Sequence, residues 1–171
     1  LFGLVAVVGM LRPLDVGSGL IFDGRSVMIS LCGLFFGPVS VLIASAITVA
    51  GRIGLGGSGQ TMGLLVIAEA AAFGLLFHYR RAKDQPDVSA KRMFVMGLLV
   101  HGSMVLLMLA LPYEHVESTL RRVAPSVLLI YPLATVLIGK VLSDQQSRIR
   151  FTDDLWQSRE ELRTTLYSIG D

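Results

Sequence analysis

The sequence predicts an all-α fold: a polytopic membrane bundle of six transmembrane helices, continued by a cytoplasmic coiled-coil-like helix. Hydrophobic residues make up 53% of the 171 residues and charged residues only 16%, a balance too apolar for a soluble domain of this size. The apolar residues gather in long runs with basic clusters between them, and the composition turns abruptly polar after residue 142. The net charge of +2 is too small to suggest a nucleic-acid partner.

Six apolar segments account for the predicted membrane helices. A full span needs about 20 residues, and several of the segments are shorter than that. The second and third can cross the bilayer only if the polar residues that flank them are partly submerged. The segments are 1–11, 27–36, 39–49, 62–77, 93–111 and 123–142.

The second and third segments predict a helical hairpin that carries two arginines. Gly37 and Pro38 separate the two runs, so we expect them to fold back there and to bring Arg25 and Arg52 to one side of the membrane. Each arginine lies about 13 residues, or roughly 20 Å, from the turn, whereas the hydrocarbon core is about 30 Å thick. A cation below the membrane surface is costly unless it lines a water-filled cavity or pairs with an anion, which favours a binding site here. The alternatives are side chains that snorkel to the surface and a turn that lies below its own membrane face.

Three other ionisable residues are candidates for the same site or for its supports. Asp23 either contacts a ligand or caps the second helix. If the helix has already begun at Asp23, its spacing from Arg25 directs the two side chains to different sides, so they need not neutralise each other. Glu69 is either a ligand or proton partner, or a neutral acid bonded to a neighbouring helix. His101 could partner Glu69 or be a satisfied interior histidine.

Several kinds of chemistry have no support in the sequence. Cys32 is the only cysteine, so disulfides and a cysteine-based zinc site are excluded, and the absence of a second histidine near His101 argues against a metal. No nucleophile, base and orienting group occur together, so we expect no catalytic residues and no cofactor in this chain.

The loops indicate the orientation of the helices. Short cytoplasmic loops concentrate lysine and arginine, and the two most basic regions lie between the fourth and fifth segments and after the sixth. Alternation then places the Gly37-Pro38 turn and the C-terminus in the cytoplasm, and Arg25 and Arg52 outside. Glycines crowd the outer loop after Arg52 and predict a flexible turn or a close approach to a ligand. They are Gly54, Gly56, Gly57 and Gly59.

The polar tail contains a sparse apolar stripe. Its spacings of four and seven residues are typical of a heptad pattern, which predicts that the sixth helix continues into a two-stranded coiled coil. A single amphipathic helix that docks on another surface is the alternative. The stripe comprises Phe151, Leu155, Leu162 and Leu166, with Ile149 before it.

Three short motifs resemble the LytS/YhcK-type membrane receptor module of bacterial sensor proteins. They are Asp23-Gly-Arg25 before the second helix, the Gly-Leu-Phe-Phe-Gly37-Pro38 turn, and the glycine-rich stretch after Arg52. In that family an Asn-x-Arg motif precedes the second helix; here Asp23 replaces the asparagine and Arg25 matches the arginine. Some members sense pyruvate with such an arginine pair plus a cysteine and a serine, which would fall near Gly63 and Val66. The resemblance therefore implies sensing of a carboxylate, with Arg25 and Arg52 as ligand contacts, and it favours the capping role of Asp23. Asp23 and Glu69 stay candidate ligand contacts on the residue-level arguments above.

The resemblance also implies a domain organisation. Residues 1–142 form the transmembrane sensory domain, residues 143–161 a signalling helix, and residues 162–171 look like the start of a PAS domain. The expected whole protein is a homodimeric sensor histidine kinase of the bacterial inner membrane, whose partners are a small anionic metabolite, the lipid bilayer and its own output domain. A diguanylate cyclase sensor and the substrate-binding membrane subunit of a vitamin-type transporter are the alternatives.

Overall fold

The computed structural model describes residues 1–11, 14–15, 21–56, 60–81, 88–108 and 113–169. Over this part the chain is helical apart from a two-residue antiparallel pairing, β1 (Leu14–Asp15) with β2 (Ile21–Phe22). The helices are α1 (Phe2–Leu11), α2 (Arg25–Leu55), α3 (Gln60–Tyr79), α4 (Ala90–Leu107) and α5 (Tyr113–Ile169). Four of them, α2 to α5, contain apolar stretches long enough to cross a membrane, and α1 is shorter. The expected all-α membrane bundle is present, but the expected six spans are not confirmed.

Helix α2 is broken at Gly37, whose φ of 75° and ψ of −165° are not helical. The following residue, Pro38, has no amide hydrogen to continue the helical ladder. A backbone with positive φ strains any residue with a side chain, so glycine is the residue that suits this position. The break therefore divides α2 into a first half, residues 25–36, and a second half, residues 38–55.

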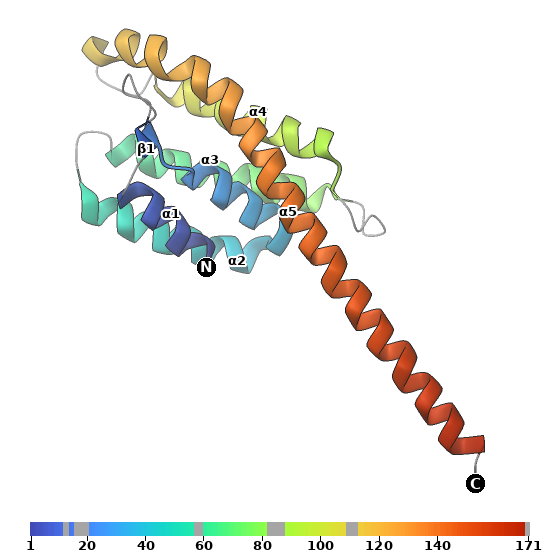
Figure 1. Cartoon of the computed structure of the whole chain (residues 1–171). Coiled ribbons are helices and arrows are strands. Elements are labelled where there is room, and N and C mark those ends of the chain that lie inside the picture. Colours follow the sequence, from blue (N-terminus) through green and yellow to red (C-terminus); the bar gives the residue numbers. More distant parts are fainter. Residues whose placement is uncertain (12–13, 16–20, 57–59, 82–87, 109–112, 170–171) are drawn as a thin grey trace.

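The two halves of α2 run in opposite directions along α1. Against the first half, the Phe2 ring lies 5.2 Å from that of Phe36, while Met10 near the other end of α1 contacts Arg25. Against the second half the order is reversed, because Gly3 packs on Ala44 and Val7 packs on Gly51. The chain thus folds back at the Gly37-Pro38 turn, as the sequence predicts, and Figure 1 shows the two halves side by side.

Small residues allow α2 and α3 to approach closely. A Cβ built on Gly33 would lie 3.1 Å from the backbone of Gly74, and one built on Gly74 would collide with the Ser30 carbonyl. Such contacts between glycines are typical of helix packing in membranes, where van der Waals contact replaces the hydrophobic effect. Further along, α3 reaches the turn of α2, where the His78 ring lies against Gly37.

The helices alternate between two ends of the bundle. We call the end that carries Arg25 and Arg52 the arginine end, and the end that carries Gly37, His78 and Gln146 the turn end. Arg92, near the start of α4, donates to the Phe77 carbonyl at the turn end, at 3.0 Å. From there α4 runs back toward the arginine end, where His101 contacts Ser26.

Helix α5 is much longer than the bundle. Its 57 residues correspond to about 85 Å, whereas a bilayer core is about 30 Å thick. Its C-terminal part runs well beyond the other helices in Figure 1, and residues 148–165 are all exposed. The expected continuation of the last membrane helix into a polar helical tail is therefore present, but a coiled coil is not confirmed.

The centre of the bundle is a layer of aliphatic side chains from the first half of α2, surrounded by α3, α4 and α5. The largest fully buried side chains include Ile29, Leu31, Leu34, Ile67, Met93 and Met96. Large apolar side chains remain exposed on the outer surfaces of α1, α2, α4 and α5, among them Val8, Leu42, Leu98 and Leu137. Such a surface is expected of a bundle that faces lipid.

Candidate functional site

Arg25 is held by an acidic residue of the same turn. Gly24 adopts a left-handed conformation, with φ of 62°, which reverses the chain just before α2 begins. As a result, Oδ1 of Asp23 accepts a hydrogen bond from the Arg25 backbone amide at 3.3 Å, and Oδ2 lies 3.3 Å from the guanidinium Nε. The expectation of side chains on different sides applied only to a helix that has already begun at Asp23, and in the structure Asp23 and Gly24 precede α2. The Nη1 atom of Arg25 also contacts Sδ of Met10, at 3.3 Å.

Arg52 lies in the last turn of α2 and crosses to α3. Its Nη1 atom donates to the Gly56 carbonyl at 2.7 Å. Its side chain passes directly over Gly63, where an added Cβ would lie 2.5 Å from Nε. The missing side chain at residue 63 is therefore what leaves room for Arg52 at this position. Gly57 and Gly59, in the glycine-rich stretch that follows, lie outside the described residues.

The two arginines share an end of the bundle and a chemical feature. The Nε atom of each is buried, and within the described residues neither Nε has a hydrogen-bond acceptor. For Arg25 the Asp23 carboxylate is near enough for an ion pair but not aligned for a hydrogen bond to Nε. A buried donor without an acceptor costs about 1–3 kcal/mol, and more when it is charged. This end of the bundle is thus suited to binding an anion.

Glu69 lies near the middle of α3. It is about 9 Å from Gly63 by helical rise, and its carboxyl group interacts with the Ser103 hydroxyl of α4. Its Oε1 atom is buried and, within the described residues, has no hydrogen-bond partner. The structure therefore links Glu69 to a neighbouring helix, and a role for it in ligand or proton binding stays a prediction.

His101 is fully buried and both of its ring nitrogens have partners. Nδ1 lies 2.6 Å from the Gly97 carbonyl, and Nε2 lies 3.0 Å from Oγ of Ser26. Because a carbonyl can only accept, Nδ1 carries the hydrogen, and a neutral ring then accepts from the Ser26 hydroxyl at Nε2. This is the satisfied interior histidine expected from the sequence, with Ser26 as its partner in place of Glu69.

Two residues near Arg25 were missed by sequence reasoning. Ser26 bonds His101, and the Tyr131 hydroxyl is hydrogen-bonded to the backbone of Asp23 and faces the charges of Asp23 and Arg25. The Tyr131 ring lies 4.8 Å from the His101 ring. A signal for Tyr131 existed, because a tyrosine within an apolar segment needs a partner for its hydroxyl.

Among the described residues, no group of three or more His, Cys, Asp and Glu side chains could hold a metal ion. The described residues at the arginine end supply the guanidinium groups of Arg25 and Arg52, the carboxylate of Asp23 and the phenol of Tyr131.

The comparisons with known proteins give one match. The family model described as 5TMR of 5TMR-LYT, a multi-helix membrane receptor module of LytS-type sensors, matches residues 1–145. No curated protein and no solved structure matches the chain. The matched residues include the whole hairpin of α2, both arginines and the membrane part of α5. The chain therefore belongs to the 5TMR family of membrane receptor modules found in LytS-type sensors.

Proposed function

We propose that this membrane sensory module binds a small carboxylate-type anion from the outer side, between Arg25 and Arg52. The observation that carries the proposal is the pair of buried Nε atoms at one end of the α2 hairpin, neither of which has an acceptor among the described residues. A carboxylate has two oxygens that match the fork of a guanidinium group, and charge-assisted bonds of this kind are among the strongest in proteins.

The surroundings of the arginines favour a small ligand. Gly63 leaves space around Arg52 that a larger side chain would fill, and the Arg25 side chain is only 13% exposed. Low exposure reduces competition from water and strengthens an ion pair. A bulky anion would have to displace the packing between α2 and α3 to reach both guanidinium groups.

The membrane orientation follows from charge. Lys91 and Arg92 lie at the turn end, which favours placing that end in the cytoplasm and the arginine end outside. We infer that the module sits in the bacterial inner membrane, with the exposed part of α5 in the cytoplasm.

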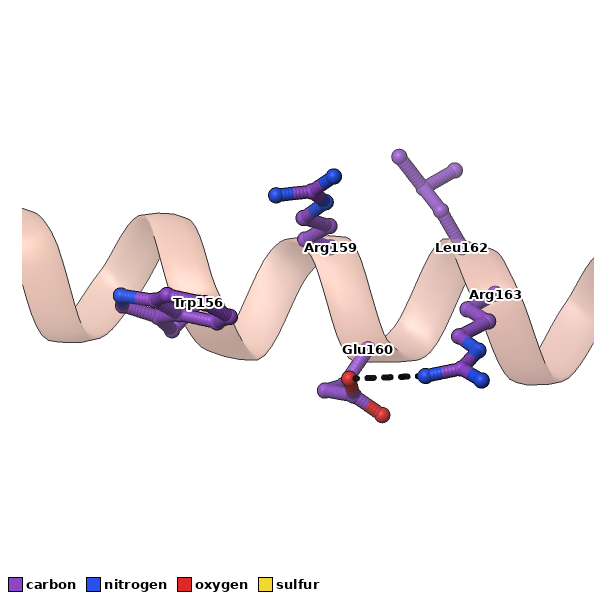
Figure 2. A pocket seen from close by; sticks show the side chains of 5 residues that line it. All are labelled: Trp156, Arg159, Glu160, Leu162 and Arg163. Carbon is purple, nitrogen blue, oxygen red and sulfur yellow. Dashed lines mark ion pairs between the residues drawn. The ribbon is translucent and has the colours of Figure 1, made fainter.

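The tail of α5 supports an output through dimerisation. Figure 2 shows Trp156, Arg159, Glu160, Leu162 and Arg163 on one stretch of the exposed helix α5, with Glu160 and Arg163 paired along the helix at 3.8 Å. Phe151, Leu155 and Leu162 are large apolar side chains that are also exposed on this helix, at intervals of four and seven residues. Apolar residues at such intervals are covered in a parallel coiled coil. We infer a homodimer that passes the signal to an output domain of the same chain, in our proposal a sensor histidine kinase.

The test is thermal unfolding of the full chain in lipid nanodiscs with sodium acetate, pyruvate, succinate and citrate. Each acid is matched with its neutral amide, because a ligand that binds only the folded state raises the melting temperature. The proposal expects at least one carboxylate to raise it while its amide does not. Equal shifts from acid and amide, or no shift from any acid, would overturn the proposal, as would accumulation of the labelled acid inside vesicles, which indicates a transport subunit.

A further inference from the structure

Helix α5 runs in the same direction as the first half of α2 and contacts this segment at three places along its length. At the arginine end Tyr131 is hydrogen-bonded to the Asp23 backbone. In the middle, a Cβ built on Gly139 would lie 3.2 Å from the Leu31 side chain. At the turn end Nε2 of Gln146 donates to the Phe35 carbonyl at 3.4 Å. From the first contact to the last, the segment that contains the first half of α2 advances from residue 23 to residue 35 and α5 advances from residue 131 to residue 146. The two helices therefore run side by side, but they are not in register.

The turn-end contact follows from the break in α2. Pro38 lacks the amide hydrogen that would bond the Leu34 carbonyl, and the non-helical Gly37 turns the later amides away. Carbonyls freed in this way need other donors. Nδ1 of His78 lies 2.9 Å from the Leu34 carbonyl, and Gln146 bonds Phe35. The end of the broken helix is thus held by side chains of α3 and α5.

The arginine-end contact is braced from α4. His101 bonds Ser26 in the first turn of α2 and packs its ring against Tyr131, which is 3% exposed. The segment that carries Arg25 is therefore fixed both to α4 and to α5. A displacement of this segment must move Tyr131 or break its bond to Asp23.

The geometry points to Tyr131 and Gln146 as positioning residues that clamp α5 to the first half of α2 at its two ends. We propose that the clamp makes the two helices move as one rod, so that a shift of the Arg25 segment is passed along α5 to its cytoplasmic tail. In this inference the movement starts when the anion binds, so this step rests on the proposed function. Gln146 holds the turn end by a long bond, and its Oε1 is buried without a hydrogen-bond partner among the described residues, so this contact is the weaker of the two.

The test is amide hydrogen exchange of the full chain in lipid nanodiscs, without any added ligand. Tyr131→Phe removes one hydroxyl, and Gln146→Leu removes one amide. The matched controls are Tyr79→Phe, at a tyrosine that is 71% exposed, and Gln157→Leu, on the exposed tail. Exchange is compared for residues 26–29 at the arginine end, residues 39–41 after the turn, and residues 66–71 in the middle of α3.

The rod predicts that each substitution speeds exchange at both ends, by about two- to tenfold for one lost hydrogen bond, while α3 and the controls stay unchanged. A change confined to the end that carries the substitution would overturn the proposal, and so would no change or an equal change throughout α3. Because no ligand is present, a module that binds no carboxylate still gives a clear result here.

Discussion

The Asp23 carboxylate lies 3.3 Å from Nε of Arg25 and accepts a hydrogen bond from the Arg25 backbone amide. The chain thus already supplies an anion to one of the two arginines that we propose as ligand contacts. A bound carboxylate has to share Arg25 with Asp23 or replace it. Repulsion between the two carboxylates lowers the affinity for the ligand.

Asp23→Asn is therefore expected to increase the affinity for a carboxylate that stabilises the wild-type chain. The asparagine keeps an acceptor for the Arg25 amide but removes the competing charge, and we expect about a fivefold lower Kd, since close charge pairs near a surface contribute about 1 kcal/mol. Isothermal titration calorimetry measures the Kd of the carboxylate for the variant and for the wild-type chain. Asp144→Asn, at an exposed residue of α5, is the control. A weaker affinity in Asp23→Asn would show that Asp23 helps to hold the ligand.

Gly63→Ala is expected to displace Arg52. An added Cβ would lie 2.5 Å from Nε and 2.9 Å from Cδ, so the arginine must leave its present position. We expect a loss of about 1–3 kcal/mol in stability, together with weaker carboxylate binding. Gly102→Ala on α4 is the matched control, since a Cβ there meets nothing within 4 Å, and alanine in a helix is favoured over glycine by about 1 kcal/mol. Equal melting temperatures for the two variants would contradict the close approach of Arg52 to α3.

Gly37→Ala is expected to destabilise the hairpin. Residue 37 has a φ of 75°, and a Cβ there would lie 3.1 Å from Nε2 of His78. With ψ of −165° the backbone lies in a region that is almost restricted to glycine, which costs a residue with a side chain about 1–3 kcal/mol, and the contact with His78 adds to this cost. Thermal unfolding in nanodiscs measures the loss, with Gly54→Ala as the control because a Cβ at Gly54 meets nothing within 4 Å. A Gly37→Ala chain as stable as the control would mean that the turn can adopt another conformation at no cost.

Gly74→Leu is expected to separate α2 from α3. The Cβ alone collides with the Ser30 carbonyl and approaches the Gly33 backbone, so a larger side chain cannot be accommodated without moving a helix. Overpacking of this kind costs about 1–3 kcal/mol or more. Thermal unfolding in nanodiscs measures the loss. An unchanged melting temperature would contradict the close packing of Gly33 against Gly74.

The hairpin was predictable because its causes are local. Pro38 removes an amide hydrogen and Gly37 permits a positive φ, and both facts are readable from two adjacent letters of the sequence. The shared end of Arg25 and Arg52 then follows from the fold-back. The polar tail was predictable for a similar reason, since its composition changes within a few residues.

Contacts between distant segments were not predictable in the same way. The pairing of Asp23 with Arg25 depends on the left-handed conformation of Gly24, which the sequence did not indicate. The packing of Arg52 over Gly63, and the contacts of Tyr131 and Gln146 with α2, depend on how helices lie against each other. The six spans are not confirmed, because α1 has 10 residues and the two halves of α2, residues 25–36 and 38–55, are also shorter than a full span of about 20 residues.

The most direct test of the central claim is the affinity of Arg25→Ala and Arg52→Ala for the carboxylate that stabilises the wild-type chain. Arg150→Ala, at an exposed residue of the tail, controls for the loss of one positive charge, and melting temperatures without ligand confirm folding. Because a hydrogen bond to a charged group contributes about 1.5–3 kcal/mol, each variant is expected to bind about 10- to 100-fold more weakly while Arg150→Ala is unchanged. Wild-type affinity in both folded variants would contradict the claim that these two arginines hold the ligand.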